Sequence, residues 1–156
     1  MAIEIERKFL VSPDFKKSGN RRKKIIQGYL TGDIQNTVRV RIIDNKGFIT
    51  VKGPGNKSGL SRFEWEHEIP FSEAEELLLL CQFGQIEKWR YEIVYSGKTF
   101  EVDEFLGENE GLLIAELELL SENEVFELPE WILEEVTGDP KYYNLMLSRH
   151  PYKAWR

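Results

Sequence analysis

Charged side chains alternate with apolar ones in seven segments of the chain. Arg39 and Arg41, for example, alternate with Val38, Val40 and Ile42. Because successive side chains of a β-strand point to opposite faces, such a segment carries its charges on one face. The polar positions that share this phase are Glu4, Glu6 and Lys8; Arg39 and Arg41; Thr50 and Lys52; Arg62, Glu64, Glu66 and Glu68; Lys88 and Arg90; Glu101 and Asp103; and Glu116 and Glu118.

This face carries both basic and acidic clusters, and each cluster suits a ligand of opposite charge. Like charges held close together on a sheet, such as Lys88 and Arg90 or Glu116 and Glu118, are mildly destabilising. Lysine and arginine bind phosphate oxygens, whereas carboxylates suit a hard divalent cation. The pattern therefore predicts a site for a polyphosphate-like anion together with a divalent metal. Hydrolysis of such an anion needs charge neutralisation and an oriented water, and no serine, cysteine or histidine nucleophile.

The elements that must position these charges are mostly strands. Turn signals separate eight strand segments, most of them in hairpin order, at 2–11, 25–31, 36–43, 48–52, 60–69, 86–95, 99–105 and 112–120. Three helices are predicted: 72–82, begun by a capping box of Ser72 and Glu75; 129–136, with proline in its first turn; and 140–149, capped by Asp139. Segments 16–24 and 53–59 are predicted to be loops. The fold class is α+β.

We expect the strands to close into an antiparallel eight-stranded β-barrel with a charged interior and a few outer helices. An open sheet with its polar face in water is the default for any single strand, but nearly every position of the charged face is a full charge. The outward apolar faces then need cover. The helix with Leu77–Leu80 and the last helix, with Tyr142, Leu145 and Met146, are predicted to provide part of it.

The bulk properties indicate a single domain over residues 1–156. Charged residues make up 31% of the chain, which exceeds the roughly 25% of typical globular proteins. The net charge of −6 provides no global attraction for nucleic acid or membrane. Cys81 is the single cysteine, so an internal disulfide or a thiolate-rich metal site is excluded. With charges in the first eight residues and no long apolar run, we expect a cytoplasmic monomer or homodimer.

Short motifs in this chain resemble those of one known family. The run Glu4-Ile5-Glu6-Arg7-Lys8 is similar to the ExExK signature of the CYTH superfamily, the triphosphate tunnel metalloenzymes. No one motif is specific by itself, but the ordered set is. Further matches follow in family order at Gln27–Leu30, Val38–Arg41, Thr50–Lys52, Ser61–Glu66, Glu87–Tyr91, Glu101–Asp103, Ala115–Glu118 and Glu135–Thr137.

The chain most resembles the short bacterial members, which are inorganic triphosphatases. The resemblance implies hydrolysis of tripolyphosphate to pyrophosphate and phosphate with Mg²⁺ or Mn²⁺, on a small-molecule substrate. It implies that Lys8, Arg39, Arg41, Lys52, Lys88 and Arg90 bind the triphosphate, and that Glu4, Glu6, Glu116 and Glu118 hold the metal. Glu64, Glu66 and Asp103 would lie near a second metal or the attacking water. Tyr29 matches a tyrosine that works with the lysine at Lys88.

Several alternatives stay open at this point. A nucleoside or thiamine triphosphatase, a class IV adenylyl cyclase, and a non-catalytic polyphosphate-binding module would all use such a face. Tyr29 is also read as a core or rim residue, Arg62 as a partner of Glu64, and Glu68 as a solvated strand end. The basic run 21–24 is read as a solvated loop or as a guide for an anion toward the barrel mouth.

Overall fold

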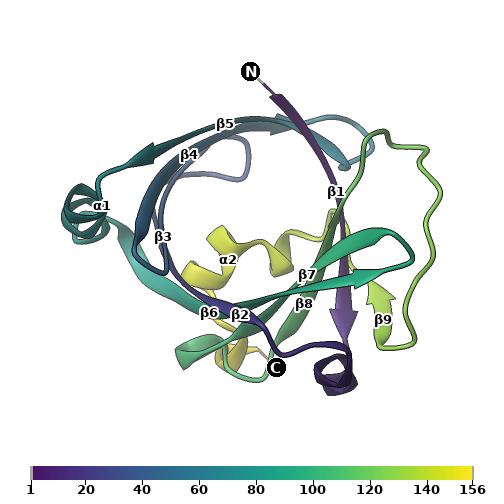
Figure 1. Cartoon of the computed structure of the whole chain (residues 1–156). Coiled ribbons are helices and arrows are strands. Elements are labelled where there is room, and N and C mark those ends of the chain that lie inside the picture. Colours follow the sequence, from purple (N-terminus) through teal and green to yellow (C-terminus); the bar gives the residue numbers. More distant parts are fainter. Residues whose placement is uncertain (1, 156) are drawn as a thin grey trace.

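The computed structural model describes residues 2–155 and contains a closed barrel of eight antiparallel strands (Figure 1). The order around the barrel is β5-β4-β3-β2-β6-β7-β8-β1, and pairing of β1 with β5 closes it. The predicted α+β barrel is confirmed. The strands are β1 (Ala2–Val11), β2 (Arg22–Gly32), β3 (Thr37–Ile43), β4 (Lys46–Gly55), β5 (Ser61–Ile69), β6 (Gln82–Tyr95), β7 (Lys98–Phe105) and β8 (Leu113–Glu118).

A ninth strand, β9 (Ile132–Glu135), extends the edge of β1. Residues 2–5 of β1 pair with β5, so beyond them the backbone of Phe9 and Val11 needs another partner, which β9 supplies. The prediction of a helix at 129–136 is therefore wrong. The proline that suggested a helix start precedes Trp131 and Ile132, which are residue types that favour strands.

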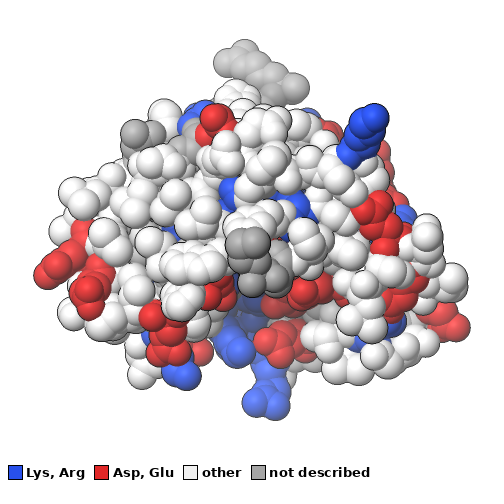
Figure 2. All heavy atoms as spheres, turned by 90° about the horizontal axis from the view of Figure 1, so that it is seen from above, with Lys and Arg blue, Asp and Glu red and all other residues white. Residues whose placement is uncertain are grey.

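The strand register places the charged phase in the lumen. Residues directly opposite each other in an antiparallel pair share a face. Arg39 lies opposite Thr50, and Arg90 lies opposite Asp103. The apolar phase points outward, as predicted. Figure 2 looks onto the barrel from the β5 side; uncharged residues cover much of that view, and Lys, Arg, Asp and Glu side chains gather toward its lower centre.

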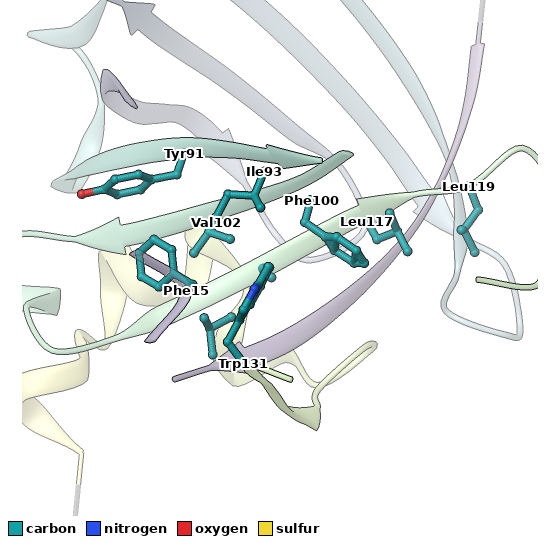
Figure 3. Close-up of a cluster of buried hydrophobic side chains, with 10 residues drawn as sticks. Phe15, Tyr91, Ile93, Phe100, Val102, Leu117, Leu119 and Trp131 are labelled. Atoms are coloured by element: carbon teal, nitrogen blue, oxygen red, sulfur yellow. The ribbon is translucent and has the colours of Figure 1, made fainter. Parts of the chain in front are cut away.

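Two apolar clusters cover the outside of the barrel. Helix α1 (Phe71–Leu78) packs Ala74 and Leu78 on Val40 and Ile42, as expected for a cover over β2–β4. On the opposite side, a 3₁₀ helix η1 (Pro13–Ser18) and the segment before β9 cover β6–β8. Figure 3 shows the members of this cluster, which include Phe15, Tyr91, Ile93, Phe100, Val102, Leu117, Leu119 and Trp131.

A third apolar cluster fills one end of the lumen. Ile86 lies two residues before Lys88, and Phe105 two residues after Asp103, so both face inward. They pack with Leu147 of helix α2 (Asn144–Arg149), which is seen through the ring of strands in Figure 1. The expectation that the last helix covers the outer face is therefore wrong. Leu112 and Ile114 complete the buried cluster, and Leu10, Tyr142, Tyr152 and Trp155 pack against it.

Several element ends differ from the predictions. Helix α1 starts after Pro70 and has no side-chain cap, so the predicted capping box of Ser72 and Glu75 does not form, and the helix ends before β6 begins. The last predicted helix is split, because Tyr143 is extended between η3 (Pro140–Tyr142) and α2. Asp139 does cap η3 by accepting a hydrogen bond from the Lys141 N–H.

The remaining short elements are η1, which replaces the start of the predicted 16–24 loop, η2 (Gly107–Asn109) and η4 (Tyr152–Ala154). Strand β2 begins at Arg22, within that predicted loop, and β4 continues to Gly55. Among the described residues, none of the helices is long and apolar enough to cross a membrane.

The apolar end of the lumen predicts a large cost for Leu147→Ala. Leu147 has no exposed surface, so the substitution leaves a cavity and should lower the free energy of unfolding by about 2–5 kcal/mol. Urea denaturation measures the change. The control is Leu120→Ala, whose side chain is 92% exposed, and which should change stability by less than about 0.5 kcal/mol. Equal effects of the two changes would contradict a packed plug.

Candidate active site

The inward side chains line a cavity of about 240 Å³. Of the predicted site residues, Glu66 and Asp103 are outside its lining, and all others contribute to it: Glu4, Glu6, Lys8, Tyr29, Arg39, Arg41, Lys52, Glu64, Lys88, Arg90, Glu116 and Glu118. The lining also includes Glu101, Thr37, Arg62, Thr137, Tyr143 and Asn144. Thr137, Tyr143 and Asn144 lie outside the alternating strands, so strand periodicity could not identify them as cavity residues.

The barrel register forces like charges together on the acidic side of this cavity. Glu6 lies directly opposite Glu118 across β1 and β8, and Glu101 lies directly opposite Glu116 across β7 and β8. Such pairs repel each other. A cation between them would remove the repulsion.

Burial and neighbouring charges shift the pKa values of the carboxyl groups on this side in different directions. Burial, with the neighbouring Glu116 and Glu4, raises the pKa of Glu6 well above its usual range. A hydrogen bond with Glu4, together with burial, raises the pKa of Glu64 to about 7. For Glu116, burial acts upward, but Lys8, Arg90 and the hydrogen bond with Glu6 hold its pKa well below the usual range. Glu64 also keeps a buried oxygen, Oε2, without a hydrogen-bond donor.

The basic side has donors that no described residue uses. The Nε–H groups of Arg39 and Arg41 are buried and have no hydrogen-bond partner. Burial and the neighbouring Arg39 and Arg90 lower the pKa of Arg41 to about 9. Buried donors normally find acceptors, so two adjacent orphan N–H groups indicate a place for an anion.

Glu66 forms ion pairs with both of these arginines. Its Oε2 accepts a hydrogen bond from the Thr50 hydroxyl at 2.5 Å and lies 3.3 Å from Arg41 Nη2 and 3.5 Å from Arg39 Nη2. Glu66 was predicted to lie near the metal or the attacking water. Its contacts in the structure are instead with the arginines.

Asp103 is the counter-ion of two buried cations. Its Oδ2 lies 2.8 Å from Lys88 Nζ, and its two oxygens accept hydrogen bonds from Arg90 Nε and Nη2 at 2.8 and 2.9 Å. All three side chains are at least 89% buried. Burial acts to raise the pKa of Asp103, but Arg90 and Lys88 hold it below its usual value. Asp103 was predicted to be a metal ligand; in the structure both oxygens are occupied by cations.

The other predicted cations sit between the two sides. Lys52 Nζ lies 2.8 Å from Glu4 Oε1 and 3.7 Å from Glu64 Oε2. Lys8 is buried, and its Nζ lies 5.4 Å from the ring centre of Tyr143. Arg62 was read as a partner of Glu64, but it donates to the carbonyl oxygens of Gly53 and Ile34 instead.

A family model described as the CYTH domain matches residues 2–144 of this chain. The chain belongs to the CYTH domain family. The resemblance that the motifs suggested is confirmed, and it extends over the strands that build the cavity.

Two relatives match this chain along nearly all of its length. An inorganic triphosphatase of Acetivibrio thermocellus is 52% identical over 157 aligned residues, which cover 100% of this chain and 99% of the relative. An inorganic triphosphatase of Nitrosomonas europaea is 38% identical, with 93% and 96% covered. The crystal structure of the inorganic triphosphatase NE1496 matches with a TM-score of 0.65 at 36% identity, covering 93% of this chain and 97% of that chain.

CYTH membership implies a divalent metal, and the acidic side of the cavity has suitable donors. Carboxylate oxygens are the ligands that Mg²⁺ and Mn²⁺ prefer. Among residues 2–155, no three histidine, cysteine or carboxylate side chains converge as a preformed metal cage. Mg²⁺ is usually held by one or two carboxylates with water and substrate phosphates, so this CYTH donor set fits a cation that binds with its substrate.

Tyr29 and Lys88, the two residues that the resemblance paired, both line the CYTH cavity but share no hydrogen bond among the described residues. They are joined through two amides. Gln27 Nε2 donates to Tyr29 Oη at 3.3 Å and to Asn144 Oδ1 at 3.2 Å, and Lys88 Nζ donates to Asn144 Oδ1 at 3.0 Å.

The first prediction from this geometry concerns Asp103→Asn. The change leaves Lys88 and Arg90 buried without their shared counter-ion, so the free energy of unfolding should fall by about 3–5 kcal/mol. Urea denaturation at neutral pH without added metal is the measurement. Asp14→Asn, at an exposed position, is the matched control and should be neutral. A loss below about 1 kcal/mol in Asp103→Asn would show that the ion pairs are not maintained.

The second prediction concerns pH. Burial lowers the pKa of Lys88 to about 8 from an ordinary value of 10.5. Between these values the unfolded state binds more protons than the folded state, so Lys88 makes the protein more stable as pH rises. The difference in unfolding free energy between the wild type and Lys88→Gln should therefore shift in favour of the wild type between pH 8 and 10. Parallel pH profiles would contradict a lowered lysine pKa.

Proposed function

We propose that this protein hydrolyses inorganic tripolyphosphate to pyrophosphate and phosphate with a divalent metal, Mg²⁺ or Mn²⁺. One observation carries the proposal. Within a single cavity, Arg39 and Arg41, whose Nε–H groups have no partner among the described residues, are combined with carboxyl groups that lie directly opposite each other, such as Glu6 and Glu118. The names of the full-length relatives, both inorganic triphosphatases, support the same substrate.

The cations bind and orient the triphosphate. In this proposal, Arg39 and Arg41 use their free N–H groups, and Glu66 keeps both guanidinium groups in place. Arginine and lysine so arranged stabilise the negative charge that spreads over the transferring phosphoryl group. The remaining substrate-binding residues are Lys8, Lys52, Lys88 and Arg90.

Glu4, Glu6, Glu116 and Glu118 are proposed to hold the metal. When bound, a divalent ion neutralises phosphate charge and lowers the pKa of a water molecule. A metal binds the ionised form of a carboxyl group, so it would favour the carboxylate of Glu6, whose pKa burial raises, and the charge of the ion would relieve the repulsion among the buried carboxyl groups. In this proposal Asp103 is not a metal ligand but the shared ion-pair partner of Lys88 and Arg90.

Glu64 is proposed to orient the attacking water and accept its proton. Its Oε2 accepts no hydrogen bond from a described residue, with Lys52 Nζ 3.7 Å away, and a pKa of about 7 is near the optimum for a general base at neutral pH. The water oxygen forms the new bond to the terminal phosphorus as the bridging P–O bond breaks. Tyr29 already accepts a hydrogen bond from Gln27, so its own O–H is available to donate to a phosphate oxygen.

Phosphate release tests the proposal. Wild type should release phosphate from tripolyphosphate with Mg²⁺ or Mn²⁺ and lose activity in EDTA. Arg39→Ala and Glu6→Gln should each lower kcat/KM by about 10²–10³-fold, as for the loss of one group that stabilises transition-state charge. Lys46→Ala and Glu73→Ala, which change exposed residues outside the cavity, should retain wild-type rates.

The same assay separates the alternatives. ATP, thiamine triphosphate and pyrophosphate are tested beside tripolyphosphate, and cyclic AMP is measured with ATP. Faster turnover of a nucleotide, or formation of cyclic AMP, would overturn tripolyphosphate as the substrate. Tight binding of tripolyphosphate without turnover under any metal would show a polyphosphate-binding module instead.

A further inference from the structure

Asn144 is the one residue of α2 whose side chain touches the buried charges of the cavity among the described residues. It follows the extended Tyr143, and its Oδ1 accepts hydrogen bonds from Lys88 Nζ at 3.0 Å and from Gln27 Nε2 at 3.2 Å. Lys88 is 1% exposed and Gln27 is fully buried. The C-terminal segment therefore supplies an acceptor to a lysine in the interior of the barrel.

The orientation of the Asn144 amide is fixed by chemistry. A lysine ammonium donates hydrogen bonds and accepts none, so only the oxygen of the amide can face Lys88. The Nδ2 group must then point elsewhere. Within residues 2–155 it has no protein hydrogen-bond partner, and Asn144 lines the cavity. Two N–H donors are therefore available beside Lys88.

The orientation continues through Gln27 to Tyr29. Because Asn144 Oδ1 is already an acceptor, the group of Gln27 that faces it must be its Nε2, as the geometry has it. That same Nε2 donates to Tyr29 Oη at 3.3 Å. The Lys88 ammonium group thus fixes the orientation of the Asn144 and Gln27 amides and of the Tyr29 hydroxyl. At the two ends of this hydrogen-bond series, Asn144 Nδ2 and the Tyr29 O–H are left as donors to the cavity.

We propose that Asn144 both positions Lys88 and donates a hydrogen bond from Nδ2 to a phosphate oxygen of the substrate. The inference rests on the proposed function, because it requires a polyphosphate in this cavity. Asn144 then makes α2 part of the binding site as well as part of the apolar plug. A neutral donor is suited to this place, because Lys88 already pairs with Asp103, and Arg90 pairs with Asp103, Glu101 and Glu116.

Two substitutions separate the two roles. Asn144→Asp keeps an oxygen for Lys88 and Gln27 but replaces the N–H donors with a second oxygen, which repels phosphate. Asn144→Ala removes both groups. Ser148→Ala is the control on the same helix, since the Ser148 hydroxyl donates to the Leu145 carbonyl oxygen.

Affinity for tripolyphosphate is measured by calorimetry in EDTA, and KM and kcat are measured with Mg²⁺. Asn144→Ala should weaken binding about tenfold, as for one lost hydrogen bond to a charged group. Asn144→Asp should weaken binding further, with a higher KM and a melting temperature no lower than that of Asn144→Ala. Ser148→Ala should bind as the wild type does.

Wild-type affinity for tripolyphosphate in Asn144→Asp would overturn the donor role. Aspartate keeps the oxygen that accepts from Lys88, so affinity would be unchanged only if Asn144 does no more than support Lys88. Unchanged KM in Asn144→Ala would overturn the inference as a whole. Binding without turnover by the wild type would refute the proposed hydrolysis while the affinities still test Asn144. Absence of binding by the wild type, with and without metal, would overturn both proposals.

Discussion

The balance of charge inside the barrel is the constraint on which the rest of the structure depends. An ionised group moved from water into a protein costs several kcal/mol unless it is paired. Asp103 satisfies this requirement for Lys88 and Arg90, and Glu66 does so for Arg39 and Arg41. Because strand pairing fixes which side chains face each other, a shift of one residue in register would turn these charges toward the outer apolar clusters.

The two sides of the cavity compensate their buried charges by different means, and this difference gives the site its chemistry. The cations are held by fixed carboxylates, with N–H groups left over on Arg39 and Arg41. On the acidic side, burial and neighbouring carboxyl groups instead raise the pKa values of Glu6 and Glu64. A divalent cation would relieve the repulsion between these carboxyl groups, and unpartnered N–H groups suit phosphate oxygens.

Sequence reasoning found the charged face because a period of two is visible in each strand separately. It could not assign partners within that face. Asp103 and Glu101 share a phase, yet Asp103 is nearly fully buried against two cations and Glu101 lines the cavity. Pairing across strands decides this, and the partners lie far apart in the chain. The same reason explains why β9 was missed, since only its position beside β1 selects a strand for that segment.

Strand periodicity also could not predict the apolar end of the lumen. This end affects the charged part of the cavity, because it borders Lys88. Ile86 and Phe105 continue the inward phase of Lys88 and Asp103, so the lumen changes from charged to apolar along the same strands. Lys88 stands at this boundary, with its Nζ 5.5 Å from the ring centre of Phe105. An ammonium group at an apolar boundary loses water on one side and must find oxygen acceptors on the other. Asp103 supplies charge, and Asn144, which follows the extended Tyr143 at the start of α2, supplies a neutral acceptor.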